Sequence, residues 1–373
     1  MLARSLQFPR DAQGVTASRE RRRDHWIATR ENSFFAWTSG QRQELLGQGS
    51  YGKVFRLAGN SAVVKDCTIA KGRHEAIRSA LQEQTIAVVL THIVLDRVCP
   101  HYLLLFNSTL DVETTNVHTH MTIEAFDGSI DKVKNWQACW TEILFQIFHA
   151  LSHIHRVLAL VHNDLYPRNI LIRQLNIRCR YDFPSDIQTS VWLDAPFLVA
   201  LADFGISTSE RLFPNAPLRL RKKATQPTPQ PFGQCVFTHH VLEYTSLPAF
   251  ARDYWALLQW TLFPSRHVAP PPGDVLTILR AVRDELNHRW TGLQAPEGSW
   301  DIFKFFLRQP QVQARLCRPS ATPCDCQAWS PEDVDGYRQN LLDRAAVFVR
   351  SLPITHKEEE TEPSFASLFS KRP

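Results

Sequence analysis

The sequence lacks any uninterrupted apolar run of 18 residues, so we expect no membrane-spanning helix and no membrane contact. Its opening stretch, MLARSLQFPRDAQ, has no apolar core long enough for a signal peptide, which predicts an intracellular protein. The eight Cys follow no secreted disulfide pattern, which also favours a reducing compartment. The formal charge of +5 is too small to indicate nucleic-acid binding.

Repeats and a complete zinc-ligand set are also missing. Cys317, Cys324 and Cys326 lie close together in the sequence, but no fourth ligand accompanies them, so we do not expect zinc. What is present is enough apolar material, 44% of 373 residues, to bury a sizeable core. The length fits one large domain or two lobes that share a cleft.

Hydrophobic periodicity predicts short strands first and long helices later. The strand patterns fall within 43–65 and at 102–106, 119–126, 159–161, 170–172 and 198–202. The helical patterns fall at 72–97, 135–157, 250–263, 274–290, 300–308 and 331–352.

A glycine-rich stretch follows the first strand pattern. It consists of Gly47, Gln48, Gly49, Ser50, Tyr51 and Gly52, with Val54 two residues later. Glycines let a backbone turn tightly and approach phosphate oxygens. A dinucleotide-binding fingerprint would continue as a helix, whereas this stretch continues as a strand. The pattern therefore favours a β-hairpin lid over a nucleotide, with these residues and Val54 as candidate binding residues.

Lys65 ends the next strand pattern, AVVK, where a cation under the lid can meet phosphates. Such a Lys needs a carboxylate to hold it, and the following helix offers Glu75 and Glu83. Glu83 shares a helical face with Ala76, Ala80 and other apolar residues, whereas Glu75 shares its face with polar ones. We therefore expect Glu83 to pair with Lys65.

The stretch HNDLYPRNIL, from His162 to Leu171, concentrates polar side chains between apolar segments. Its spacing lets Asp164 accept a substrate hydroxyl proton while Asn169 binds a metal, with Arg168 as a further cation for the transferred phosphate. A second metal ligand is Asp203, which ends an apolar strand and precedes Phe204-Gly205.

In this order, GQGSYGKV, AVVK, HNDLYPRN and DFG resemble the signature set of the protein kinases. Asp253, in ARDYWALLQWTLF, is similar to the Asp that braces the catalytic-loop backbone of that family. The resemblance covers about residues 43–265 and implies an ATP- and Mg²⁺-dependent enzyme. It also implies that backbone groups of Glu124 and Phe126, at the hinge between lobes, pair with adenine, so that their side chains matter little.

The expected fold class is α+β, a bilobal kinase-like fold. Residues 41–126 form a small strand-rich N-lobe and 127–352 a larger helical C-lobe. Residues 1–40, with RERRR at 19–23, are expected to be a basic and mobile arm. Residues 353–373 are expected to be a disordered tail.

The sequence departs from the common kinase pattern at several points. Asn163 replaces the Arg that usually contacts a phosphorylated activation loop, so we expect no loop-phosphorylation switch. Tyr166 stands where serine/threonine kinases usually carry Lys, and Arg168 falls where tyrosine kinases place Arg, which leaves the hydroxyl preference open. The interval between Asn169 and Asp203 is long, and 174–196 is interpreted as an inserted excursion.

No Ala-Pro-Glu follows Gly205, and the loop instead contains the basic run 218–223, which is either a docking site for acidic substrates or a solvated run. An HND-type loop without Ala-Pro-Glu is similar to kinases of large double-stranded DNA viruses, including fish herpesviruses, and to the haspin branch. That resemblance implies a host cytoplasm or nucleus.

The leading hypothesis is an active protein kinase directed at serine or threonine, a monomer that acts on a protein substrate. One alternative is a pseudokinase scaffold, which the divergent loop favours. The other is a small-molecule phosphotransferase, which the variable His-x-Asp loop favours.

Overall fold

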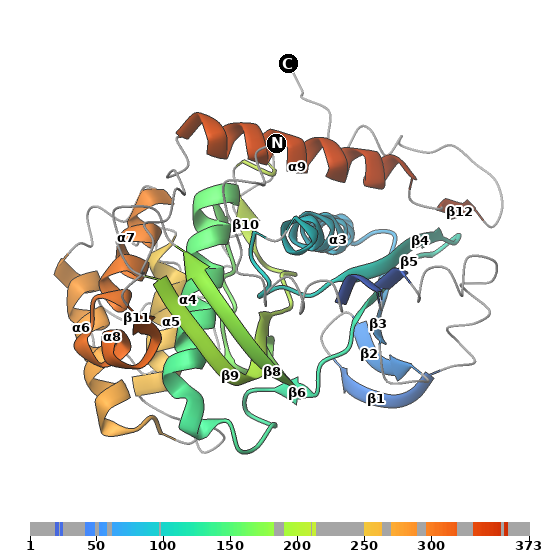
Figure 1. Cartoon of the computed structure of the whole chain (residues 1–373). Coiled ribbons are helices and arrows are strands. Elements are labelled where there is room, and N and C mark those ends of the chain that lie inside the picture. Colours follow the sequence, from blue (N-terminus) through green and yellow to red (C-terminus); the bar gives the residue numbers. More distant parts are fainter. Residues whose placement is uncertain are drawn as a thin grey trace, which may run out of the picture.

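The chain is α+β, with a sheet-rich N-terminal part and a helical C-terminal part, in the computed structural model (Figure 1). The structure describes residues 19–21, 23–24, 42–48, 52–57, 62–96, 98–182, 190–209, 211–213, 250–262, 270–288, 296–318, 331–351 and 354–356. No helix among these residues is long and apolar enough to cross a membrane.

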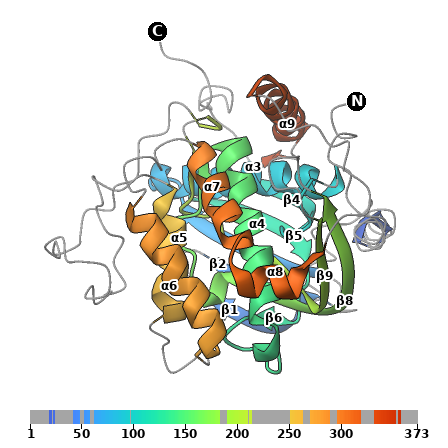
Figure 2. The same cartoon turned by 60° about the vertical axis from the view of Figure 1, so that its left-hand side comes forward.

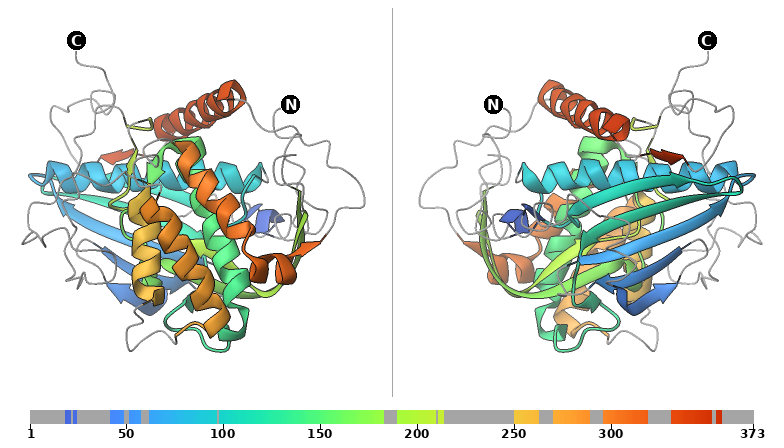
Figure 3. Two further views of the ribbon diagram at one scale, coloured as in Figure 1. Left: turned by 90° about the vertical axis from the view of Figure 1, so that its left-hand side faces the viewer. Right: turned by 90° about the vertical axis from the view of Figure 1, so that its right-hand side faces the viewer.

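A six-stranded sheet forms the N-terminal part. Its order is β1 (Arg42–Gln48), β2 (Gly52–Leu57), β3 (Ala62–Ala70), β5 (Asn116–Glu124), β4 (Leu105–Val112) and β12 (Ile354–His356). Neighbouring strands are antiparallel except for β12, which pairs in parallel with β4. Helix α3 (His74–Leu95) packs beside the sheet, as Figure 3 shows from two sides. The predicted strand at 102–106 lies earlier than the strand found, because β4 begins at Leu105.

The C-terminal part is built around α4 (Trp140–Leu158), which lies among the other helices (Figure 2). These are α5 (Ala251–Leu262), α6 (Gly273–His288), α7 (Pro296–Leu307), α8 (Pro310–Leu316) and α9 (Pro331–Ser351). Trp140, Phe145 and Phe148 of α4 are fully buried, and each contributes about 1.5–3 kcal/mol by burial. The sequence predicted all of these helices except α8.

Residues 174–196 do not form the separate excursion that we predicted. Instead β8 (Ile170–Asp182) and β9 (Ser190–Leu201) pair along their lengths as one long hairpin, and β6 (Gly128–Ser129) and β11 (Cys317–Arg318) extend this sheet. In β9, side chains alternate between buried and exposed, with Val191 and Leu193 inside and Trp192 outside. The insertion therefore lengthens an existing hairpin. Residues 183–189 lie outside the described residues.

The predictions for the two ends of the chain are wrong where the structure describes them. Residues 19–21 and 23–24 are helical, and the Arg19 side chain is fully buried, so this part is not a mobile arm. Ile354–His356 form β12 on the edge of the sheet, so this part of the tail is ordered. Residues 1–18 and 357–373 lie outside the described residues.

Helix α9 bridges the two parts and lies over α3 and α4 (Figure 1). Near its middle, Tyr337 donates to Asp96 at 3.0 Å, and Arg344 forms an ion pair with the same carboxylate just after α3. Arg338, the residue after Tyr337, donates to the carbonyl of Val157 near the end of α4. The helix thus holds the end of α3 against the C-terminal part.

Two buried imidazoles, of His101 and His149, and the partly buried imidazole of His153 join α4 to the β8–β9 hairpin. His149 stands 3.2 Å from His153 on α4, and its ring packs edge-on against His101. His101 approaches the carbonyl of Val199 at 3.2 Å and the hydroxyl of Tyr181 at 3.3 Å. Burial lowers the pKa of His101 and of His153 to about 3, and that of His149 well below its usual value.

Stability is expected to fall in acid because of these imidazoles. Their folded-state pKa values lie below the unfolded value of about 6.5, so the unfolded chain binds more protons between these limits. The free energy of unfolding should not be reduced by these imidazoles above pH 6.5. Toward pH 4 it should decrease by up to about 1.4 kcal/mol per pH unit for each imidazole. Urea unfolding across this range measures the slope. His149→Phe should reduce the pH slope of the free energy of unfolding by the equivalent of about one proton. His288→Asn, at an exposed position, should leave the slope unchanged. If His149→Phe has the same slope as the wild-type chain, His149 is not one of the groups that cause the loss of stability in acid.

Candidate active site

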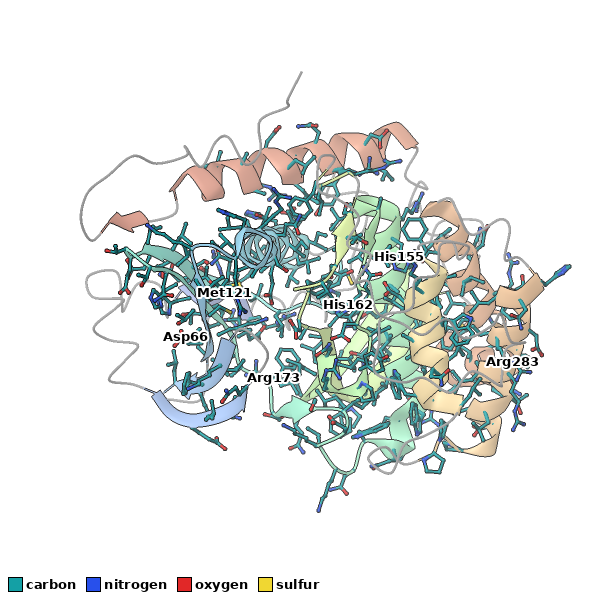
Figure 4. All side chains as sticks on the ribbon, turned by 180° about the vertical axis from the view of Figure 1, so that it is seen from behind. Asp66, Met121, His155, His162, Arg173 and Arg283 are labelled. Atoms are coloured by element: carbon teal, nitrogen blue, oxygen red, sulfur yellow. The ribbon has the colours of Figure 1, made fainter. Side chains whose placement is uncertain are left out.

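The described residues that we predicted to bind nucleotide or to act in catalysis line one cleft of about 1240 Å³, between the N-terminal sheet and the C-terminal part. These are Gly47, Gln48, Gly52, Val54, Lys65, Glu83, Glu124, Phe126, Asp164, Arg168, Asn169 and Asp203. Val63 and Leu171 give the cleft an apolar section. Figure 4 labels His162 and Arg173, which lie where the two parts of the molecule meet.

Lys65 lies between two carboxylates. Its Nζ is 2.5 Å from Oε1 of Glu83 and 2.9 Å from Oδ1 of Asp203. The predicted pairing with Glu83 is therefore confirmed. Ser79, one turn before Glu83 on α3, also donates to the carbonyl of Gly205 at 2.5 Å, a contact that the sequence did not predict. Strand β3, helix α3 and the segment after β9 thus meet at a single cation.

The charge state of this group follows from its surroundings. Burial alone would lower the pKa of Lys65, but the adjacent Glu83 and Asp203 carboxylates outweigh burial and raise it well above its usual range. Burial would raise the pKa of Asp203, but the Lys65 ammonium outweighs burial and lowers it. Near neutral pH, Lys65 is a fixed cation and Asp203 an anion, and the Asp203 side chain is 49% exposed to the cleft.

The glycine-rich stretch begins where β1 ends and resumes in β2. Gly47 and Gln48 are exposed and line the cleft, while Gly49, Ser50 and Tyr51 lie outside the described residues. A Cβ at Gly52 would stand 2.5 Å from the carbonyl oxygen of Asp66 on β3, so only glycine fits there. Gly52 is thus required by the close approach of two strands, independently of any phosphate.

The loop before β8 places three polar side chains side by side. Asn169, in the short 3₁₀ turn Pro167–Asn169, donates from Nδ2 to Oδ2 and to the main-chain carbonyl of Asp164, each at 2.8 Å. Arg168 donates to both carboxylate oxygens of Asp164 at 2.9 Å. The Arg168 side chain is 55% exposed and stacks 5.0 Å over the ring of Tyr166, so Arg168 adds a positive charge beside the Asp164 carboxylate.

His162 supports this loop and does not face the cleft. The ring is fully buried and packs 4.6 Å from the ring of Phe204. Its Nε2 donates to the carbonyl of Ala202 at 2.9 Å, and its Nδ1 accepts from the N–H of Asp164 at 3.3 Å. One imidazole thus fixes the backbone of both Asp164 and the residue before Asp203.

Asp253 holds the backbone of the same loop in place, as predicted. Its Oδ2 accepts from the N–H of His162 at 2.7 Å and its Oδ1 from the N–H of Asn163 at 2.9 Å. His155 lies 2.9 Å from Oδ2, and the carboxylate is fully buried. Burial would raise the pKa of Asp253, but the hydrogen bond and charge of His155 outweigh burial and lower it.

Asn163 joins the loop to the segment that follows Gly205. Its Nδ2 donates to the carbonyl of Ile206 at 3.2 Å and to the hydroxyl of Thr208 at 3.0 Å. The backbone of Asn163 has φ 63°, in the left-handed region that Asn tolerates better than most residues. Asp203 also has φ 61°, so the two segments that carry the polar groups are both in strained conformations.

Glu124, at the predicted hinge, corrects one prediction. Its N–H donates to the carbonyl of Leu104 at 2.9 Å and is thus used within the protein. Its carboxylate is buried and forms ion pairs with Arg19 at 2.7 Å and Arg173 at 2.8 Å. The side chain therefore matters structurally. Sequence reasoning missed both arginines, because neither stands in a recognisable motif.

Asn169 and Asp203 fit a Mg²⁺ ion in their donor chemistry. Both offer oxygen ligands on the cleft, and Mg²⁺ sites that include phosphates commonly use only one or two protein ligands. Among the described residues, no group of three or more His, Cys, Asp or Glu side chains could hold a metal by itself. Cys317 is a free thiol within that part of the chain, and Cys324 and Cys326 lie outside it.

The assignment of the cleft rests on these contacts. The residues that line the cleft come from strands of the N-terminal sheet, from α3 and α5 and from the loops between them, at positions between 44 and 256. The chain matches no model of a known protein family, and no curated protein matches it.

Proposed function

We propose that the chain is an ATP- and Mg²⁺-dependent protein kinase that phosphorylates serine or threonine hydroxyls. The observation that carries the proposal is the arrangement around the cleft, where the Lys65–Glu83 ion pair and Asp203 face Asp164 and Asn169. Phosphoryl transfer depends mainly on positioning and charge neutralisation, and this set supplies both.

Each residue has a role in this proposal. Lys65, held by Glu83, binds phosphate oxygens of the nucleotide, and the backbone of the glycine-rich stretch covers them. Asp164 accepts the proton of the acceptor hydroxyl, and Arg168 adds positive charge beside the transferred group. Asn169 and Asp203 would hold Mg²⁺, which supplies further charge neutralisation at the phosphates when bound.

The alternatives make different demands on the same residues. A pseudokinase scaffold does not need Lys65, Asp164, Asn169 and Asp203 in one cleft, and their common placement favours catalysis. A small-molecule phosphotransferase would use the same groups, so only the acceptor distinguishes it. The similarity to kinases of large DNA viruses and to haspin rests on the HND-type loop and on the missing Ala-Pro-Glu, and a host cytoplasm or nucleus is part of the proposal on the ground of that similarity.

The test is transfer of labelled phosphate from ATP to a panel of generic proteins by the purified chain, with Asp203→Asn as the inactive control. Transfer to Ser or Thr by the wild-type chain and at least a hundredfold less by Asp203→Asn would support the proposal. Binding of Mg-ATP without transfer to any protein would favour the scaffold, and transfer only to small hydroxylated compounds would favour the third function.

Activity is expected without phosphorylation of the segment after Gly205. Asn163, in place of a phosphate-reading Arg, already holds Ile206 and Thr208 through its amide. A phosphate orders a loop mainly by finding a cation, and Arg168 is engaged with Asp164. Phosphatase-treated protein should therefore act at the same rate as protein pre-incubated with ATP. A lag in phosphate transfer that pre-incubation with ATP removes, together with a phosphate mapped between residues 206 and 245, would contradict this expectation. The basic run at 218–223 lies outside the described residues.

A further inference from the structure

Arg19 makes an unusual set of contacts for a residue in a basic stretch near the N-terminus. The side chain is fully buried, and its Nε and NH2 lie 2.9 and 2.7 Å from Oε2 of Glu124. Its NH1 donates to the carbonyl of Pro100 at 2.6 Å and its NH2 to that of Tyr102 at 2.5 Å. One guanidinium thus holds the hinge carboxylate and two backbone carbonyls that precede β4.

Arg23, one helical turn later, strengthens the same contact. Its Nε donates to the carbonyl of Leu105 at 3.1 Å. Residues four apart lie on one face of a helix, so Arg19 and Arg23 together dock this turn on the segment 100–105. In Figures 2 and 3 the turn, drawn in dark blue, lies beside the β8–β9 hairpin.

Arg173, on β8, is the third arginine of this cluster. Its NH1 is 2.8 Å from Oε1 of Glu124, and its guanidinium stands 5.9 Å over the ring of Phe126. The fully buried guanidinium of Arg19 and the partly buried one of Arg173 therefore share one carboxylate, and that of Arg173 also covers Phe126. Glu124 and Phe126 both line the cleft, so this cluster fixes the backbone that borders it.

We propose that Arg19 is a positioning residue of the nucleotide site, and that the N-terminal turn which carries it belongs to the catalytic unit. This inference rests on the proposed function, because it assigns the backbone of 124–126 to the adenine ring. Hydrogen bonds from both Arg19 and Arg173 hold the Glu124 carboxylate in place, and with it the hinge backbone that we assign to the base. Preorganisation of this kind raises affinity because less ordering remains to be done on binding.

The hydrogen bonds made by Arg19 require an arginine side chain and not a lysine. A planar guanidinium has five N–H donors in a fixed fork, enough for a carboxylate and two carbonyls at once. A lysine ammonium at this position would pair with Glu124 and leave at least one of the carbonyls of Pro100 and Tyr102 without this donor. Arg19→Lys therefore keeps the positive charge but changes the arrangement of the hydrogen-bond donors.

The experiment separates the base-binding part of the cleft from its phosphate-binding part. Adenosine and Mg-tripolyphosphate are titrated calorimetrically into the full-length wild-type chain, Arg19→Ala, Arg19→Lys and Arg21→Ala. Arg21 lies on the same turn and is exposed, so its replacement is the matched control. We expect adenosine affinity to fall about tenfold in Arg19→Ala and by a smaller factor in Arg19→Lys. Tripolyphosphate affinity should be unchanged in all four proteins.

Three results would overturn the inference. Wild-type adenosine affinity in a folded Arg19 variant would show that the contact does not position the hinge. Equal losses for adenosine and tripolyphosphate would show only a general loosening of the fold. If Arg19→Ala does not fold, Arg19→Lys decides between these outcomes. A wild-type chain that binds neither probe would remove the proposed function and the inference together, whereas wild-type binding with unchanged variants removes the inference alone.

Discussion

Replacement of Asp164 by Asn is expected to lower phosphate transfer by about 10²–10⁴-fold with little change in nucleotide affinity, since that range is what a positioned general base contributes. The carboxylate is the only part of the side chain that can take a proton from an acceptor hydroxyl. In the structure it accepts from Arg168 and from Asn169, and neither partner can replace it as a base. Single-turnover kinetics with labelled ATP, together with calorimetric titration of Mg-ADP, measures both quantities.

The variant to compare with Asp164→Asn is Lys65→Met. Lys65 pairs with Glu83 and Asp203 and is assigned to the nucleotide phosphates, so its loss should weaken nucleotide binding as well as transfer. The two variants should therefore separate: one loses transfer alone, the other loses both. Near wild-type turnover in Asp164→Asn would show that another group takes the proton, or that transfer needs no base.

The ion pair of Lys65 shows what a single sequence can predict about a site. Glu75 and Glu83 are eight residues apart, which places them about 80° apart around a helix. Only Glu83 shares its face with small apolar residues, and a face of that kind packs against a sheet. Helical geometry was thus sufficient to select the partner, although the two residues of the pair are separated by the second half of β3, a turn and the first part of α3.

The β8–β9 hairpin was predictable in principle but was interpreted as an excursion. The alternation of buried Val191, Leu193 and Ala195 with exposed Trp192 and Asp194 is the period-two signal of a half-buried strand. By comparison with the kinase pattern the interval between Asn169 and Asp203 is too long, and the extra length was interpreted as an insertion. The hydrophobic pattern, considered alone, indicates the strand.

Arg19 and β12 could not have been predicted in this way. Arg19 bonds to Glu124 over a separation of 105 residues, and in the sequence it belongs to a charge run of the kind that is usually solvated. The strand Ile354–His356 is three residues long and gives no periodic signal. Both contacts depend on tertiary structure. Arg19 finds its carboxylate partner on Glu124, and β12 pairs with β4, which is also distant in the sequence.

Asp253→Asn is expected to lower the free energy of unfolding by about 3 kcal/mol and to abolish transfer, because it breaks a buried charged network. The carboxylate is fully buried and accepts two backbone N–H groups and, from His155, a third hydrogen bond. An amide must turn its NH₂ toward one of these donors, which leaves a buried donor unsatisfied. The N–H groups of His162 and Asn163 would then lose their anchor, and the loop that carries Asp164 would shift.

The matched control for this change is Asp284→Asn on α6. Its carboxylate is 65% exposed and pairs with the neighbouring Arg283, so its loss should change stability by less than about 0.5 kcal/mol. Urea unfolding of both variants gives the free energies, and the transfer assay gives the activities. A stable Asp253→Asn protein with wild-type transfer would show that the loop holds its shape without the carboxylate. A stable but inactive protein would show that Asp253 positions the loop without stabilising the fold.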